Sequence, residues 1–186
     1  MKKPNNLFLI VLCLIILIFV GCSKNEEKNA QQIAKDFVED LYTVSDEEVE
    51  NYKSLLNVSP SEAMEMDVYN AVQINDDVLK SLTTEDAYET LLINRENLKF
   101  TVICYRANCT MQVTEIQLSE NNADIDNNAA DYNFEVNLKL ILNDGTETEG
   151  TAKGTVSLSK IDDDWKITRY KMKADPDVLR KLLVEM

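Results

Sequence analysis

Cys104 and Cys109 are the residues whose types and spacing most directly suggest chemistry. Four residues separate them, and both fall on the apolar side of a segment in which apolar and polar residues alternate. If this segment folds as a hairpin with a four-residue link, the thiols lie opposite one another, and a disulfide closing so small a loop adds about 2 kcal/mol. The other interpretation is two buried thiols that pack as small hydrophobic groups. A catalytic dithiol is not expected, because redox motifs place the two cysteines closer together and at a helix start.

The residues that are missing exclude several reactions. The chain has no His, so catalysis by Ser-His-Asp or Cys-His and zinc sites with His ligands are excluded. Tyr132 and Arg169 are the polar residues that strand alternation places on the apolar face of the predicted sheet, and they are candidates for contacting a ligand. Their other interpretations are a tyrosine at the core edge and a cation whose head reaches water. No carboxylate shares that face, so we expect no catalytic residue, no enzyme activity and no cofactor.

A short acidic segment has the spacing of a calcium loop. Asp124, Asp126 and Asn128 fit positions 1, 3 and 5, and Glu135 falls at the twelfth. Ala129 stands where a glycine makes the sharp turn of such loops, and Glu135 lies within a predicted strand. We therefore expect a solvated hairpin loop and no metal site.

The first half of the chain shows signals of several short helices. An apolar stripe at three- and four-residue spacing predicts the first of them: it comprises Ala30, Ile33, Ala34, Phe37, Val38 and Leu41. Ser45 with Glu48 forms a capping box that begins a second helix. Ser59 followed by Pro60 predicts a third over residues 60–72, and Thr83 or Thr84 begins a fourth.

The second half alternates with the period of a strand. Residues 98–104 and 109–113 are predicted as strands, and the clearest strand is Tyr132–Leu142. Asn143-Asp144-Gly145 predicts a hairpin turn into a further strand through residues 154–158, and an acidic turn at 162–164 leads into Trp165. A helix from about residue 175 to 186 closes the chain.

The amino terminus indicates export. After Met1-Lys2-Lys3, residues 7–20 form an apolar run that spans about 21 Å as a helix, too short for a bilayer core of about 30 Å. The run ends at Gly21-Cys22, which resembles the lipobox of bacterial lipoproteins, although Phe19 stands where Leu is usual. That resemblance implies that residues 1–21 are a signal peptide, that Cys22 carries the lipid, and that residues 22–29 are a lipidated tether on the outer side of the cell membrane. An uncleaved anchor and an ordinary secretory signal are the alternatives.

The charge limits the partners of such a protein. The full chain has a net charge of −14, and removal of residues 1–21 leaves 17 basic against 33 acidic side chains, a net −16. Nucleic acid is therefore excluded as a partner, and an anionic membrane surface repels the domain. The membrane contact must come from the lipid.

Helices followed by an antiparallel meander predict an α+β fold. Residues 30–186 form one domain, in which N-terminal helices pack on a curved antiparallel sheet of about four strands. The long strand, the Asp-Gly turn, the second long strand and the acidic turn before Trp165 resemble the NTF2-like, cystatin-like cone. The resemblance implies a protein-binding, ligand-binding or enzymatic role, because such cones serve all three.

We therefore interpret the chain as a non-catalytic, lipid-anchored envelope protein that binds an envelope protein or an extracellular ligand. The alternatives are a small-molecule pocket protein and, less favoured, an enzyme of the NTF2-like fold. A large internal pocket would favour the small-molecule alternative, whereas a filled cone would favour protein binding. The soluble domain is predicted to be monomeric.

Overall fold

The computed structural model describes residues 27–57, 77–124, 128–174, 176 and 178. Residues 27–42 are helical, and four helices follow: α2 (Asp46–Leu56), α5 (Asp77–Leu82), α6 (Glu85–Ile93) and α7 (Glu96–Ala107). The four strands are β1 (Cys109–Asp124), β2 (Ala129–Leu142), β3 (Glu147–Ile161) and β4 (Asp164–Ala174). They form one antiparallel sheet in the order β1-β2-β3-β4.

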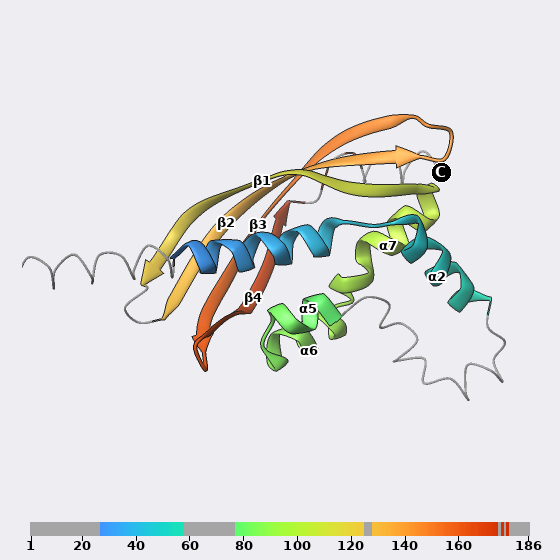
Figure 1. Ribbon diagram of the computed structural model, residues 1–186. Coiled ribbons are helices and arrows are strands. Elements are labelled where there is room, and N and C mark those ends of the chain that lie inside the picture. Colours follow the sequence, from blue (N-terminus) through green and yellow to red (C-terminus); the bar gives the residue numbers. More distant parts are fainter. Residues whose placement is uncertain (1–26, 58–76, 125–127, 175, 177, 179–186) are drawn as a thin grey trace, which may run out of the picture.

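This arrangement confirms the predicted α+β fold, with helices against a curved sheet of four strands (Figure 1). The predicted signal peptide with Cys22, the helix over 60–72 and Asp126 of the calcium-like loop lie outside the described residues. So does nearly all of the predicted C-terminal helix.

The helix of residues 27–42 lies along the curved sheet (Figure 1). Its predicted stripe is the buried face: Ala30, Ala34, Phe37, Val38 and Leu41 are at most 4% exposed. Burying side chains of this size contributes about 1.5–3 kcal/mol for each large one. The helix is therefore held mainly by its contact with the sheet.

The predicted caps of two later helices are confirmed. At α2, the Glu48 backbone N–H donates to Ser45 Oγ, and the Ser45 backbone N–H donates to Glu48 Oε2 at 2.6 Å. At α6, the Ala87 N–H donates to Thr84 Oγ1, so Thr84 is the N-cap rather than Thr83. Such caps satisfy N–H groups that the first turn of a helix leaves open.

The predicted strand over residues 98–104 is wrong, because these residues belong to α7. The side chains that α7 buries are Phe100, Thr101, Cys104 and Ala107, which have helical spacing. The β-branched residues 101–103 favour a strand locally, but tertiary packing against α2 and β1 overrides that preference. The four-residue hairpin between the cysteines is therefore wrong as well.

The long strand β2 confirms the predicted alternation. Its even-numbered residues from 130 to 140 are buried against the helices, and its odd-numbered residues lie on the outer face. The predicted turn joins it to β3, with Gly145 at a φ of 83° and the Thr146 N–H donating to Asp144 Oδ1 at 2.8 Å. That hydrogen bond lowers the pKa of the Asp144 carboxyl.

A β-bulge between β3 and β4 overturns the predicted position of Arg169. Leu158 pairs with Ile167, but the next residue along β3, Ser157, pairs with Arg169, so Thr168 is an extra residue on β4. The extra residue reverses the alternation beyond it. Arg169 is consequently exposed, whereas Tyr170 is half-buried against the core.

Candidate functional site

The inner face of the sheet is covered and filled. Among the described residues, the largest fully buried side chains come from the helix of residues 27–42, α7 and all four strands, and they include Tyr42, Tyr132, Phe37, Phe100 and Met111. Their rings contact one another: the Tyr42 and Phe100 centroids are 4.5 Å apart, and the Tyr42 and Phe134 centroids are 6.0 Å apart. The part of an NTF2-like cone that could hold a ligand is therefore occupied by protein side chains.

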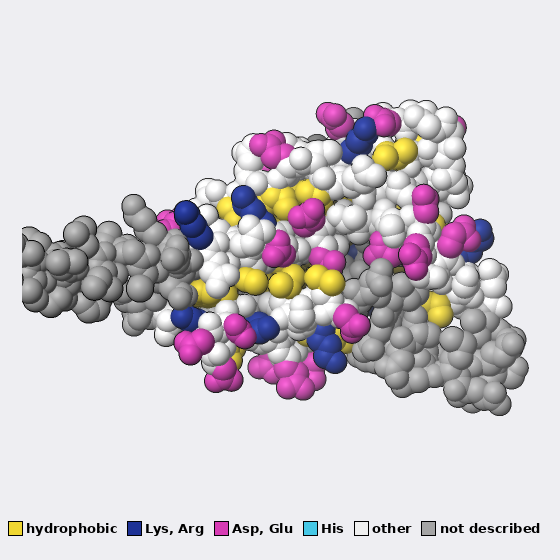
Figure 2. All heavy atoms as spheres, in the orientation of Figure 1, with side chains coloured by type: hydrophobic (Ala, Val, Ile, Leu, Met, Phe, Trp, Pro, Cys, Tyr) yellow, Lys and Arg dark blue, Asp and Glu magenta, His cyan; other side chains and the backbone are white. Residues whose placement is uncertain are grey.

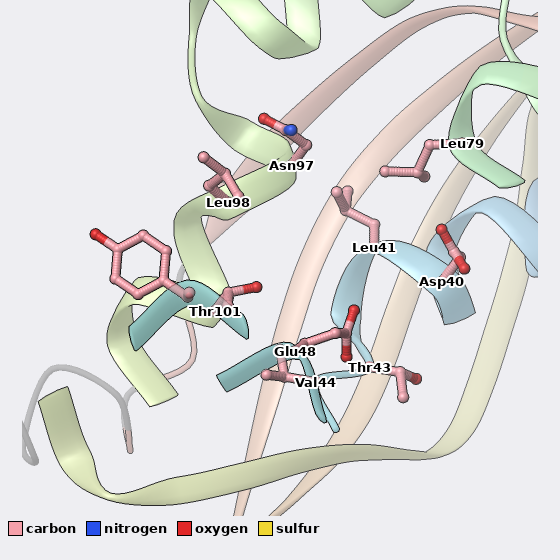
Figure 3. Close-up of a pocket in the computed structure, with 10 residues that line it drawn as sticks. Asp40, Leu41, Thr43, Val44, Glu48, Leu79, Asn97, Leu98 and Thr101 are labelled. Atoms are coloured by element: carbon pink, nitrogen blue, oxygen red, sulfur yellow. The ribbon is translucent and has the colours of Figure 1, made fainter. Parts of the chain in front are cut away.

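A narrow pocket remains between the helix of residues 27–42, α2, α5 and α7 (Figure 3). Asp40, Glu48 and Asn97 are among its polar lining residues, but its volume is about 30 Å³. Liquid water occupies about 30 Å³ per molecule, so this space suits one or two water molecules rather than a metabolite. The Glu48 carboxylate is in addition engaged by the capping box at Ser45.

The end of α7 and the β2–β3 turn lie with α2 at one end of the molecule (Figure 1). A larger opening is lined by residues of these three segments. We call it the distal groove. Its volume is about 470 Å³, and the residues that line it are Asp46, Val49, Glu50, Lys53, Tyr105, Arg106, Asn108, Cys109 and Asn143. A hydrogen bond of 3.0 Å from the Asn143 N–H to the Asn108 carbonyl oxygen ties the turn to the end of α7.

The distal groove mixes charge with apolar surface. Lys53 forms an exposed ion pair with Glu50 at 2.9 Å, whereas Arg106 is exposed and has no ion pair among the described residues. The Tyr105 ring meets the Tyr52 ring edge-on, with centroids 5.5 Å apart. An aromatic ring beside an arginine is typical of the residues that contribute most to protein interfaces.

One of the two predicted cysteines, Cys109, lines this groove, and Cys104 lies on the other side of the turn between α7 and β1. Cys104 faces inward from the last turns of α7, and Cys109 is the first residue of β1; both are buried, and both are free thiols. The two thiols influence each other: Cys109 raises the pKa of the Cys104 thiol, and Cys104 lowers the pKa of the Cys109 thiol. A helix-to-strand turn, and not the predicted hairpin, joins the two cysteines.

Tyr132 and Arg169, the candidates for ligand contacts, are not brought together. Tyr132 is 1% exposed on the inner face, and its hydroxyl has no hydrogen-bond partner among the residues that the structure describes. Burial, with contributions from Glu27 and Glu120, raises the pKa of Tyr132 to about 12. Because Arg169 is exposed on the opposite face, the two residues do not form a site.

The outer face of the sheet has a shallow hollow of about 340 Å³ and is dominated by polar pairs. Lys153 Nζ lies 2.6 Å from Glu135 Oε2, and Lys173 Nζ donates to Asn133 Oδ1 at 2.8 Å. Such exposed pairs contribute about 0–1 kcal/mol each. The charged residues that line this hollow are therefore paired and solvated.

Acidic side chains are spread over the visible surface, rather than gathered into one patch (Figure 2). No cluster of three or more metal-ligating side chains occurs within the described ranges. Likewise, none of the helices in the part of the chain that the structure describes is long and apolar enough to cross a membrane.

Comparisons with known proteins do not identify a family. No protein-family model and no curated protein matches the chain. Among solved structures, the chain is similar to a periplasmic fragment of TraM, with a TM-score of 0.49 and 7% identity over 80% of this chain and 98% of that one.

Two further similar structures have lower scores. One is a putative calcium/calmodulin dependent protein kinase II association domain from Xanthomonas campestris, with a TM-score of 0.35 and 13% identity over 54% of this chain and 74% of that one. The other is an NTF2-like superfamily protein from Salmonella enterica serovar Typhimurium, with a TM-score of 0.36 and 14% identity over 54% and 79%. At these scores the fold assignment rests on the helices and sheet of the chain itself.

Most residues of the distal groove were not predicted as site residues. Lys53, Arg106 and Asn143 are far apart in the sequence, and only the packing of α2 against α7 and of α7 against the β2–β3 turn brings them together. A helical period over residues 96–107 was the one signal that would have placed Arg106 and Cys104 correctly. Alternation of apolar residues in the same segment concealed it.

Proposed function

We propose that this protein is a non-catalytic, lipid-anchored protein of the cell envelope that binds a partner protein through the distal groove. The single observation that supports binding at the surface is the filled inner face of the sheet, where Tyr42, Phe100 and Phe134 occupy the space of a cone cavity. The remaining pocket of about 30 Å³ is too small for a metabolite. The small-molecule alternative therefore has no enclosed site among the described residues.

The anchor rests on the sequence. Gly21-Cys22 follows an apolar run that is too short to span a bilayer, as in the lipobox of bacterial lipoproteins. Two or more acyl chains on Cys22 would hold the domain stably, since one chain alone gives only marginal binding. The net charge of −16 after removal of the signal peptide argues against any electrostatic contribution from anionic lipids.

The direction of the first described helix favours a groove that points away from the membrane. Residues 27–42 span about 24 Å as a helix, and the start of this helix lies near Tyr132, whose pKa responds to Glu27. Its other end leads to Val44, which bridges to Met111 of β1 close to the groove. Residues 27–29 of the predicted tether belong to this helix, so a tether that ends before residue 27 would hold the opposite end of the molecule next to the membrane.

The lining of the distal groove suits a polypeptide segment. It offers two cations, two carboxylates, backbone-like amides and the Tyr105 ring in an open volume of about 470 Å³. Mixed polar groups around an aromatic residue and an arginine are common in protein interfaces.

Site-specific photo-cross-linking in cells tests this function. A benzophenone amino acid at Lys53, on the groove, should give a discrete adduct of higher mass from the full chain, whereas the same group at Arg169, on the outer face of the sheet, should not. Arg106→Glu should reduce the Lys53 adduct at least fivefold, and the matched variant Arg169→Glu should leave it unchanged. Equal adducts from both positions, or none from Lys53, would refute the groove as the binding surface.

A further inference from the structure

The turn between α7 and β1 brings two buried cysteines close together. Asn108 ends α7 in a left-handed conformation, with φ 50° and ψ 54°, and this reverses the chain within one residue. Cys104 and Cys109, on either side of the turn, are 0% and 2% exposed, and the Asn108 N–H donates to the Cys104 carbonyl oxygen, which folds the chain back at this point. Both cysteines therefore lie at the junction of α7 and β1.

The two thiols differ in their access to the surface. Cys109 is among the residues that line the distal groove, together with Arg106 and Lys53, whereas Cys104 lies behind it among the buried side chains of α7. A disulfide-bearing molecule that enters the groove therefore reaches Cys109 first. The exposed Arg106 guanidinium on the groove favours the approach of an anionic reagent.

The pKa values of the two thiols differ in the same sense as their position relative to the groove. The interaction with Cys109, followed by burial and the nearby Glu48 carboxylate, raises the pKa of the Cys104 thiol. The interaction with Cys104 lowers the pKa of the Cys109 thiol, although burial opposes it. The thiolate is the nucleophile in disulfide exchange. The Cys109 sulfur is therefore the one that attacks the incoming disulfide, and the Cys104 sulfur is the one that attacks second.

We propose that Cys104 and Cys109 form an oxidisable dithiol site, in which Cys109 reacts through the distal groove with an incoming disulfide and Cys104 completes an intramolecular disulfide. The proposal uses the groove as a route to Cys109 and requires neither the lipid anchor nor a bound partner protein. It differs from a catalytic dithiol, because the product is the oxidised protein itself.

The exchange balances in two steps. The Cys109 thiolate attacks one sulfur of the incoming disulfide, whose S–S bond breaks, and the departing sulfur takes the electron pair and a proton. Cys104 then loses its proton, attacks the Cys109 sulfur of the mixed disulfide and displaces the second thiolate, which is protonated. The protein loses two electrons and two protons, and the incoming disulfide becomes two thiols.

The product would join the last turns of α7 to the first residue of β1. This crosslink lies under Arg106 and Asn108, so it would hold the floor of the distal groove in one arrangement. Oxidation would thereby alter the surface that we propose for partner binding.

Trypsin provides a direct readout, because it cleaves at Arg106, between the two cysteines. The full chain in detergent is treated with oxidised glutathione or with reductant, free thiols are alkylated, and the protein is digested. Oxidation should give one species in which peptide 100–106 is linked to peptide 107–139, with the summed mass less two hydrogen atoms. The reduced sample should give two alkylated peptides instead.

A matched pair of variants tests the order of reaction. In Cys104→Ser, Cys109 should be trapped as the glutathione mixed disulfide; in Cys109→Ser, Cys104 should react at least tenfold more slowly in the folded protein. Thermal unfolding of both variants checks that they remain folded, and the order of alkylation in the wild-type chain gives the same information without substitution.

Several results would overturn the proposal. One is a linked peptide that forms only after unfolding in urea, which would leave the thiols as core packing. Another is equal reactivity of Cys104 and Cys109 in the folded chain. Repeating the assay with a dithiol oxidase in its disulfide form shows whether the disulfide is supplied by a protein or by a small molecule. If neither the oxidase nor oxidised glutathione yields the linked peptide, the site is refuted. The absence of a photo-cross-linked adduct at Lys53 would refute partner binding at the groove, but it would leave the test of the dithiol site unaffected.

Discussion

The hydroxyl oxygens of Tyr42 and Tyr170 lie 3.0 Å apart and form a hydrogen bond between the end of the first described helix and β4. The Tyr170 ring also stacks on Phe134 and contacts Phe37, with centroid distances of 6.1 and 5.6 Å. Tyr170 faces the core only because the bulge at Thr168 reverses the alternation of β4. One irregular residue thus determines which polar side chain joins the helix to the sheet.

Removal of either hydroxyl of this pair should destabilise the domain. Tyr42→Phe and Tyr170→Phe are each expected to lower the free energy of unfolding by about 0.5–1.5 kcal/mol, the usual contribution of such a hydrogen bond. The double variant should be less destabilised than the sum of the two, with a coupling of about 1 kcal/mol in urea unfolding. Strict additivity would show that the two hydroxyls act independently.

Removal of the Tyr132 hydroxyl, in contrast, should not destabilise the domain. Its buried hydroxyl has no partner among the described residues, so Tyr132→Phe should leave the stability unchanged or increase it at pH 7. Since the folded-state pKa of about 12 exceeds the ordinary value of 10, folding favours the protonated phenol, and this contribution is lost as the pH rises from 10 to 12.

The pH dependence supplies the measurement for Tyr132. Each unit of pKa difference corresponds to about 1.4 kcal/mol, so the wild-type protein should lose stability more steeply than Tyr132→Phe between pH 10 and 12. Parallel stability curves for the two proteins in that range would contradict the assignment.

Gly154 is expected to tolerate no side chain. It pairs with Phe134 across β2 and β3, and a Cβ at this position would overlap the Phe134 ring and the Lys171 carbonyl oxygen. Gly154→Ala should therefore cost about 1–3 kcal/mol, as overpacking in a core usually does. Ser159→Ala, on the outer face of the same strand, is the control and should change stability by less than about 0.5 kcal/mol. Equal effects of the two variants would argue against the observed packing of the ring.

Cys22→Ala should abolish incorporation of a fatty-acid label and leave the precursor uncleaved or released. The matched variant Cys13→Ala changes a cysteine within the predicted signal peptide and should retain full labelling. Undiminished labelling of Cys22→Ala would remove the basis of the proposed anchor.

A soluble domain that begins near Asn29 is expected to be monomeric at micromolar concentration. On the outer face of the sheet, Glu135 pairs with Lys153 and Lys139 Nζ lies 2.7 Å from Glu147, whereas stable homodimer interfaces are more apolar. The large negative charge also opposes association at low salt. Light scattering that gives twice the monomer mass across a tenfold dilution would contradict this expectation.

Local patterns in the sequence determined much of the fold. The stripe from Ala30 to Leu41 specifies a helix with one buried face, Ser45 and Glu48 mark the start of the next, and the alternation of residues 132–142 specifies a strand with one apolar face. Each of these signals depends on residues within a few positions of one another, which the local backbone geometry relates directly.

Tertiary structure alone decided the rest. Residues 98–104 have the pattern of a strand but form part of α7, because burial of Phe100 and Cys104 against neighbouring elements outweighs a local preference of a few tenths of a kcal/mol per residue. The side on which Arg169 lies depends on the bulge at Thr168, which is a property of two paired strands. The distal groove joins α2, α7 and the β2–β3 turn, and no local pattern encodes contacts between segments so distant in sequence.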